Sequence, residues 1–169
     1  MQLLVVFNIL TLLCQHLISK MEELVAKLKE KKLTLSCCES LTGGLFASSL
    51  VNISGVSEVF VGGYVTYQNK AKERILKGAE VLKNFGAISD EMACLMALTA
   101  LNDFGSDIAI SFTGNAGPNP DEEKPVGLVY SCLIIKGKTH HFKDTYLGTR
   151  SEIRNQCIQD AKKRILMFL

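Results

Sequence analysis

The sequence lacks the features that mark several common classes of protein. Its net charge is only +2 over 169 residues, and no stripe of basic and aromatic residues is present, so we expect no nucleic-acid partner. Neither G-x-x-x-x-G-K-[ST] nor a G-x-G-x-x-G after an apolar run occurs, which excludes the two common phosphate-binding loops. None of the six cysteines forms a C-x-x-C pair, so we expect reduced core cysteines in a cytoplasmic protein.

What is present is enough apolar sequence for one folded domain. Hydrophobic residues make up 47% and charged residues 21% of the chain, which is typical of a protein with a substantial core. Apolar runs alternate with helical patterns, and this order predicts an α/β fold. The expected strands are 33–38, 59–66, 108–111, 126–135 and 139–147, and the expected helices are 45–52, 69–76, 90–104 and 150–165, with 76–87 as a connecting segment.

The N-terminal end is an apolar extension, residues 1–20, which we interpret as the start of a helix packed on the domain or on a second subunit. No Lys or Arg precedes the apolar run, which is unlike a secretory signal. Asn8, Gln15 and His16 interrupt it, so membrane association is not expected. Two alternatives stay open: an uncleaved anchor, or an upstream start codon with the natural start at Met21.

The stretch Glu39 to Gly44 joins a buried strand to a helix. Backbone N–H groups at a helix start have no partner inside the helix, and the helix dipole makes that end positive. A hydroxyl at Ser40 would therefore lie beside an anion or oxyanion site, which the glycines leave open to a ligand. The alternative is a capped helix whose glycines serve close packing.

Lys72 is a candidate general base. If Asn69 caps the helix that follows, Lys72 falls in its first turn, where the dipole disfavours a cation. Lys70 and Arg74 add like charge nearby, and each effect favours the neutral amine. The alternative is a solvated surface lysine.

Two further regions suggest ligand contacts. The Gly- and Pro-rich loop from Thr113 to Pro120 follows a short strand, and loops at the carboxyl ends of strands bind ligands in α/β domains. Arg150 and Arg154 share a face near the start of the last helix, which a capping box at Thr149 opens. Two cations at the positive end of a helix suggest a bound phosphate, although both arginines could instead be solvated.

Four segments taken together resemble one family, the CinA C-terminal domain or nicotinamide mononucleotide deamidase family. They are residues 39–44, 65–72, 113–118 with 124–127, and 148–154. The resemblance covers residues 21–169 and implies a single three-layer α/β/α domain with a mixed sheet that forms a homodimer. It also implies an amidohydrolase that deamidates nicotinamide mononucleotide to nicotinate mononucleotide and ammonia, in pyridine nucleotide salvage.

Transferred motif by motif, the resemblance makes Ser40 the nucleophile and Lys72 its base, with Tyr67 assisting proton transfer or positioning the pair. We expect no metal and no cofactor. The residues predicted to contact the nucleotide substrate are Thr42, Gly43, Gly44, Asn69, Thr113, Gly114, Arg150 and Arg154. The alternative function is a nucleotide- or phosphate-binding module without catalysis, which the same glycines and arginines would serve.

The chain departs from the family pattern at Leu41, Asn115 and Thr149. Of these, Asn115 lies in the predicted site loop and bears on the substrate range. The molybdopterin-binding-like module of larger family members has no counterpart in the 169 residues, so its activity is not expected.

Overall fold

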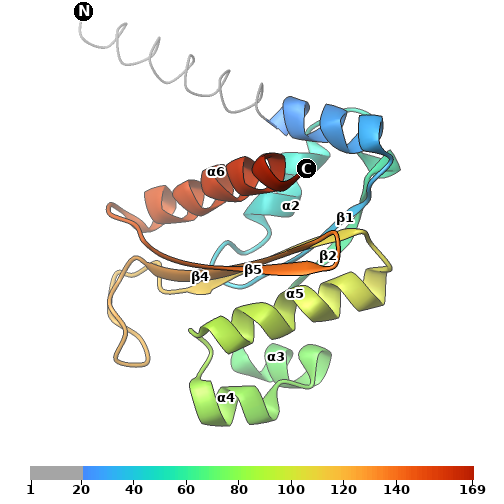
Figure 1. Ribbon diagram of the computed structural model, residues 1–169. Coiled ribbons are helices and arrows are strands. Elements are labelled where there is room, and N and C mark those ends of the chain that lie inside the picture. The colour runs from blue at the N-terminus through green and yellow to red at the C-terminus, as the bar shows by residue number, and fades with distance from the viewer. Residues whose placement is uncertain (1–20) are drawn as a thin grey trace, which may run out of the picture.

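The computed structural model of the protein describes residues 21–169 (Figure 1). The predicted helix over residues 1–20 lies outside the described residues. Residues 21–31 are helical. The elements that follow are β1 (Leu35–Glu39), α2 (Leu45–Val51), the 3-10 turn Val56–Glu58, β2 (Phe60–Val65), α3 (Asn69–Leu76), α4 (Ala79–Phe85), α5 (Asp90–Phe104), β3 (Ile108–Gly114), β4 (Leu128–Ile135), β5 (Lys138–Thr145) and α6 (Arg150–Phe168).

The five strands form one mixed sheet in the order β2-β1-β3-β4-β5. β1 lies in parallel between β2 and β3, whereas β4 and β5 are added as an antiparallel hairpin. Because β1, β2 and β3 run the same way, their carboxyl ends meet at one edge of the sheet, where α/β domains bind ligands.

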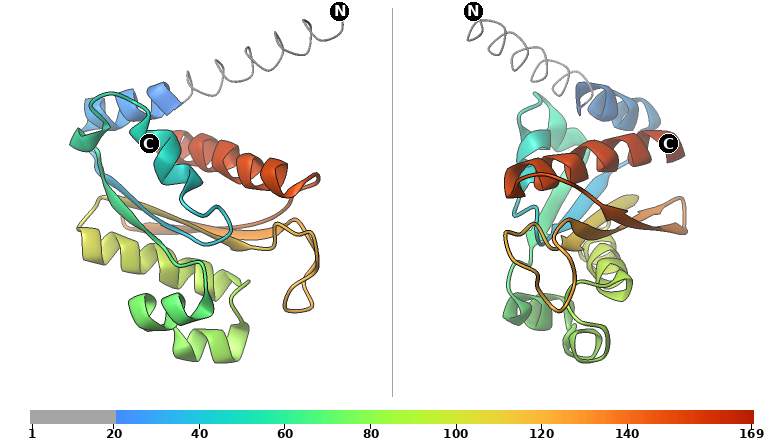
Figure 2. Two further views of the ribbon diagram at one scale, coloured as in Figure 1. Left: turned by 180° about the vertical axis from the view of Figure 1, so that it is seen from behind. Right: turned by 90° about the vertical axis from the view of Figure 1, so that its left-hand side faces the viewer.

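Helices cover both faces of this sheet. α2, α6 and the helix of residues 21–31 lie on one face, and α3, α4 and α5 lie on the other (Figures 1 and 2). The larger core fills the space under α2 and α6, around Phe46, Phe112 and Ile153. A smaller one lies under α5, around Met92 and Met96. The predicted three-layer α/β/α domain with a mixed sheet is therefore confirmed.

Two local predictions are wrong. The segment 76–87 contains α4, which lies between Gly78 and Gly86 and has no fully buried side chain. In this short helix Val81 and Leu82 are partly buried against the core. Two such residues are too few to give a clear helical periodicity, so the pattern did not reveal the helix. Asn69 is the first residue of α3 rather than its cap, and Gln68 precedes it without a side-chain cap bond. The capping box predicted at Thr149 is confirmed, and Ser89 caps α5 by accepting a hydrogen bond from the Met92 N–H.

Within residues 21–169, no helix combines the length and the apolar character that crossing a membrane requires.

Candidate active site

A pocket opens at the carboxyl edge of the three parallel strands. Its volume is about 510 Å³, in the range of small-molecule sites. Seven of the predicted site residues line it: Ser40, Tyr67, Asn69, Lys72, Thr113, Gly114 and Arg150. Thr42, Gly43, Gly44 and Arg154, also predicted to bind substrate, are not among the lining residues. The structure therefore gathers side chains from the ends of all three strands and from the start of α6.

Ser40 and Lys72 meet inside this pocket. Ser40 directly follows β1 and Lys72 lies in α3, yet the Lys72 Nζ is 3.0 Å from the Ser40 Oγ. The amine also contacts the carbonyl oxygens of Thr66 at 2.8 Å and Tyr67 at 3.4 Å. These distances are within or close to hydrogen-bond range. A nucleophile and a base in direct contact are the minimum requirement for a serine–lysine mechanism.

The surroundings of Lys72 favour its neutral form. Its side chain is buried, with 1% of the residue exposed, and this burial lowers the pKa of the amine below its ordinary value. Cys38 and Glu122 act in the opposite direction but are weaker. The sequence predicted the same direction of the Lys72 pKa shift but a different cause. Loss of solvent dominates, whereas the expected influence of Lys70 and Arg74 is absent.

The Glu39 carboxylate occupies the start of α2, where we predicted an anion or oxyanion site. It is fully buried and accepts hydrogen bonds from the N–H groups of Gly44 at 3.0 Å, Phe46 at 3.1 Å and Ala47 at 2.9 Å. These are the first free donors of α2, so the chain supplies its own anion there. The expectation that Gly44 would offer its N–H to a substrate is therefore wrong.

Two other main-chain donors are left at the turn. The N–H groups of Leu41 and Thr42 have no acceptor among residues 21–169. Leu41 lines the pocket directly after Ser40. The residue after a nucleophile supplies one oxyanion donor in many hydrolases. If the site has an oxyanion hole, these two groups are its candidates.

The two arginines at the start of α6 have different surroundings. Arg150 lies at the pocket, where it donates to the Gly117 carbonyl at 2.6 Å and to the Tyr67 hydroxyl at 2.5 Å. Arg154 instead donates to the Thr42 carbonyl at 2.6 Å. A shared helix face thus does not bring both cations to one anion. Arg154 supports the turn after Ser40, and Arg150 is the cation available to a ligand.

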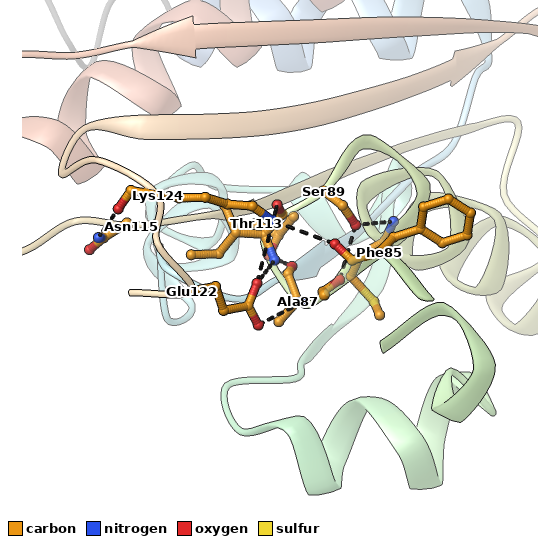
Figure 3. Close-up of polar contacts among 10 residues, drawn as sticks. Phe85, Ala87, Ser89, Thr113, Asn115, Glu122 and Lys124 are labelled. Atoms are coloured by element: carbon orange, nitrogen blue, oxygen red, sulfur yellow. Dashed lines mark hydrogen bonds and ion pairs between the residues drawn. The ribbon is translucent and has the colours of Figure 1, made fainter. Parts of the chain in front are cut away.

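Tyr67 approaches the serine–lysine pair through its main chain. Its carbonyl oxygen contacts Lys72, while its hydroxyl accepts the bond from Arg150. This geometry suits a role in positioning Lys72 and Arg150 better than a role in proton transfer. Thr113 is also already engaged, because its hydroxyl donates to the Ala87 carbonyl at 2.5 Å (Figure 3).

Two residues shape the site in ways that the sequence did not predict. Glu39 ends a buried strand, and nothing in its position predicts the cap that it forms. Asn115 binds within its own loop, to Asn119 and Lys124 carbonyls and to the Gly117 N–H. Its side chain therefore organises the loop, and its effect on a substrate would be indirect.

These features define an α/β domain with a buried serine–lysine pair at the carboxyl edge of a mixed sheet. The chain belongs to the CinA C-terminal domain family, whose model matches residues 18–169. A CinA-like protein of Kosmotoga olearia is 48% identical over 144 residues, which are 83% of this chain and 35% of that protein. The chain thus spans about a third of the length of the curated relatives that it matches.

Solved structures of the family share the fold. The competence/damage inducible protein CihA of Agrobacterium tumefaciens is 35% identical, with a TM-score of 0.85 over 90% of this chain and 94% of that chain. A CinA superfamily protein of Escherichia coli is 28% identical, with a TM-score of 0.87 over 90% of each chain. The family resemblance inferred from the four sequence segments is therefore confirmed.

Proposed function

We propose that the protein is an amidohydrolase that converts nicotinamide mononucleotide to nicotinate mononucleotide and ammonia. The observation that carries the proposal is the 3.0 Å contact between the Lys72 Nζ and the Ser40 Oγ inside a pocket. An amide is a poor electrophile, so its cleavage needs an activated hydroxyl and a stabilised oxyanion. The family resemblance supports the choice of substrate.

The surroundings of Lys72 suit the first step. A neutral amine has two protons and one lone pair. The carbonyls of Thr66 and Tyr67 can accept the two protons, which leaves the lone pair for the Ser40 hydroxyl proton. As that proton moves to Nζ, the Ser40 Oγ forms a bond to the amide carbon, and the carbonyl electron pair moves to the oxygen. The Leu41 and Thr42 N–H groups would stabilise the resulting oxyanion.

The second step releases ammonia. When the tetrahedral intermediate collapses, the carbon–nitrogen bond breaks and the Lys72 ammonium gives its proton to the leaving nitrogen. Water then attacks the acyl-enzyme, with Lys72 again as the base, and Lys72 returns that proton to the Ser40 Oγ as the carbon–oxygen bond to Ser40 breaks. Nicotinate mononucleotide leaves as its carboxylate once the new carboxyl group has given its proton to the released ammonia. Arg150 would bind the phosphate, because its guanidinium retains N–H donors beyond the two used by Gly117 and Tyr67.

The test is ammonia release from nicotinamide mononucleotide by Ser40→Ala and Lys72→Ala variants. Matched controls are Ser48→Ala and Lys70→Ala, since both residues are exposed and neither lines the pocket. Removing a hydrolase nucleophile costs on the order of 10⁶ in kcat, so we expect both site variants to be inactive and both controls to be normal. Near-native rates in the site variants would exclude the mechanism.

The binding-module alternative predicts a different pattern. The native protein would then release no ammonia, and stabilisation by nicotinamide mononucleotide in thermal unfolding would persist in Ser40→Ala. We also expect the enzyme to be a cytoplasmic homodimer. Analytical ultracentrifugation and cell fractionation test these two properties separately from catalysis.

A further inference from the structure

The pocket has an outer wall formed by a strap, residues 118–124. The strap ends in a tight turn from Asp121 to Lys124, closed by main-chain hydrogen bonds of 3.4 and 2.9 Å between those two residues. Both central residues are glutamates in the left-handed region, Glu122 at φ 50° and Glu123 at φ 58°. Such turns favour Asn and Gly, because other side chains are strained there. The fold therefore maintains an unfavourable backbone at this turn.

The contacts of Glu122 explain why the strain is tolerated. Its carboxylate accepts hydrogen bonds from the N–H groups of Ala87 at 2.9 Å and Ile88 at 3.0 Å (Figure 3). A Cβ at Gly86 would lie only 2.5 Å from the Glu122 Oε2, and Gly86 itself has φ +82°. The segment 86–88 is thus shaped around a carboxylate that arrives from another part of the chain.

Lys124 adds a second connection between the same two segments. Its ammonium donates to the carbonyl oxygens of Ile88 and Phe85, and it lies 3.5 Å from the Glu122 carboxylate (Figure 3). Both side chains are only 27% exposed, so solvent screens these contacts incompletely. Glu123, in contrast, makes no hydrogen bond or ion pair within residues 21–169.

We propose that Glu122 and Lys124 are positioning residues that clamp the strap against residues 85–88 and so fix the outer wall of the substrate pocket. Both clamped segments line the pocket, through Ala87 and Ile88 on one side and Pro118 to Glu122 on the other. Ser40 and Lys72 are held from the strand ends, independently of the strap. The clamp therefore controls how tightly the substrate is held, and it affects the bond-breaking step only through the charge of Glu122, which raises the pKa of Lys72. The substrate part of this inference rests on the proposed function.

Hydrogen exchange at the Ala87 and Ile88 amides tests the clamp itself, measured by NMR in Glu122→Ala and in Glu123→Ala. The second variant is a matched control, because it removes the same charge from the neighbouring left-handed position. Hydrogen bonds to a charged group are strong enough that their loss should speed local exchange about tenfold or more. We expect that change in Glu122→Ala only. Equal exchange rates in the two variants would overturn the clamp.

Kinetics of ammonia release from nicotinamide mononucleotide test the positioning role. Compared at a pH where Lys72 is neutral in every variant, Glu122→Ala and Lys124→Met should raise KM about tenfold and change kcat less than about twofold. This pattern is expected when the substrate and the transition state lose the same binding energy. Glu123→Ala should leave both constants unchanged. A normal KM in a variant whose Ala87 and Ile88 amides exchange quickly would overturn the positioning role. If the native protein released no ammonia, the proposed function would fail, and the exchange rates would still decide the clamp.

Discussion

Replacing Glu39 by glutamine should destabilise the protein although the two side chains have nearly the same shape. The buried carboxylate accepts three main-chain N–H groups at the start of α2, two through one oxygen and one through the other. A glutamine amide has a single acceptor oxygen, so in either orientation at least one N–H of Gly44, Phe46 or Ala47 would face an NH₂ group. The loss of one such charge-assisted bond in a buried place costs about 1.5–3 kcal/mol.

Thermal unfolding followed by circular dichroism measures this cost. For a chain of this length, 1 kcal/mol shifts Tm by about 2–4 °C, so we expect Glu39→Gln to lower Tm by roughly 3–12 °C. Glu152→Gln is the matched control. Glu152 completes the capping box of α6, and glutamine serves that motif as well as glutamate, so its Tm should stay at the native value. If both variants had the Tm of the native protein, the assignment of Glu39 as the cap of α2 would be refuted.

Three further predictions concern the pocket. Because burial lowers the pKa of Lys72 and only the neutral amine acts as a base, kcat/KM should rise with pH through an ionisation below the ordinary lysine value of 10.5. Glu122 raises that pKa, so Glu122→Gln should move the rise to lower pH in a pH–rate profile; a profile unchanged in this variant would show that the two groups do not interact. Arg150→Met should raise KM for nicotinamide mononucleotide by about ten- to hundredfold, the effect of losing a charged hydrogen bond. Arg154→Met should instead lower Tm, because Arg154 donates a hydrogen bond to a carbonyl of the turn. Steady-state kinetics measures the first effect and calorimetry the second. A lowered Tm in Arg150→Met together with a raised KM in Arg154→Met would contradict the assignment. Asn115→Ala removes three hydrogen bonds inside the loop and should cost about 1–3 kcal/mol in denaturant unfolding, whereas an unchanged midpoint would show that the loop does not depend on this side chain.

The family resemblance predicted that Ser40 and Lys72 act together, and the structure places the Lys72 Nζ 3.0 Å from the Ser40 Oγ. Ser40 directly follows β1, and Lys72 lies in α3, the helix after β2. Neighbouring parallel strands present their carboxyl ends at one edge of a sheet. The pKa direction of Lys72 was also predictable, but its main cause was not. Burial depends on which segments cover the amine, and that information is not local to α3.

Contacts made by individual side chains were harder to predict. Arg150 and Arg154 lie four residues apart, and helical spacing alone predicts that they act together. The packing of α6 places one beside Tyr67 and the other beside Thr42, which only the tertiary structure determines. Glu39 and Glu122 were missed for the same reason, because each binds main-chain groups of a segment whose position the sequence pattern does not give.

The central position of β1 has a practical consequence for the study of this family. Ser40 follows the strand that lies between β2 and β3, and its own N–H donates to the Phe112 carbonyl on β3 at 2.9 Å. The Ser40 main chain cannot leave its place unless the middle of the sheet separates. Covalent labelling of Ser40 by a serine-reactive electrophile should therefore persist up to the melting transition and disappear with it, so that a single reagent would report global folding as well as the state of the pocket.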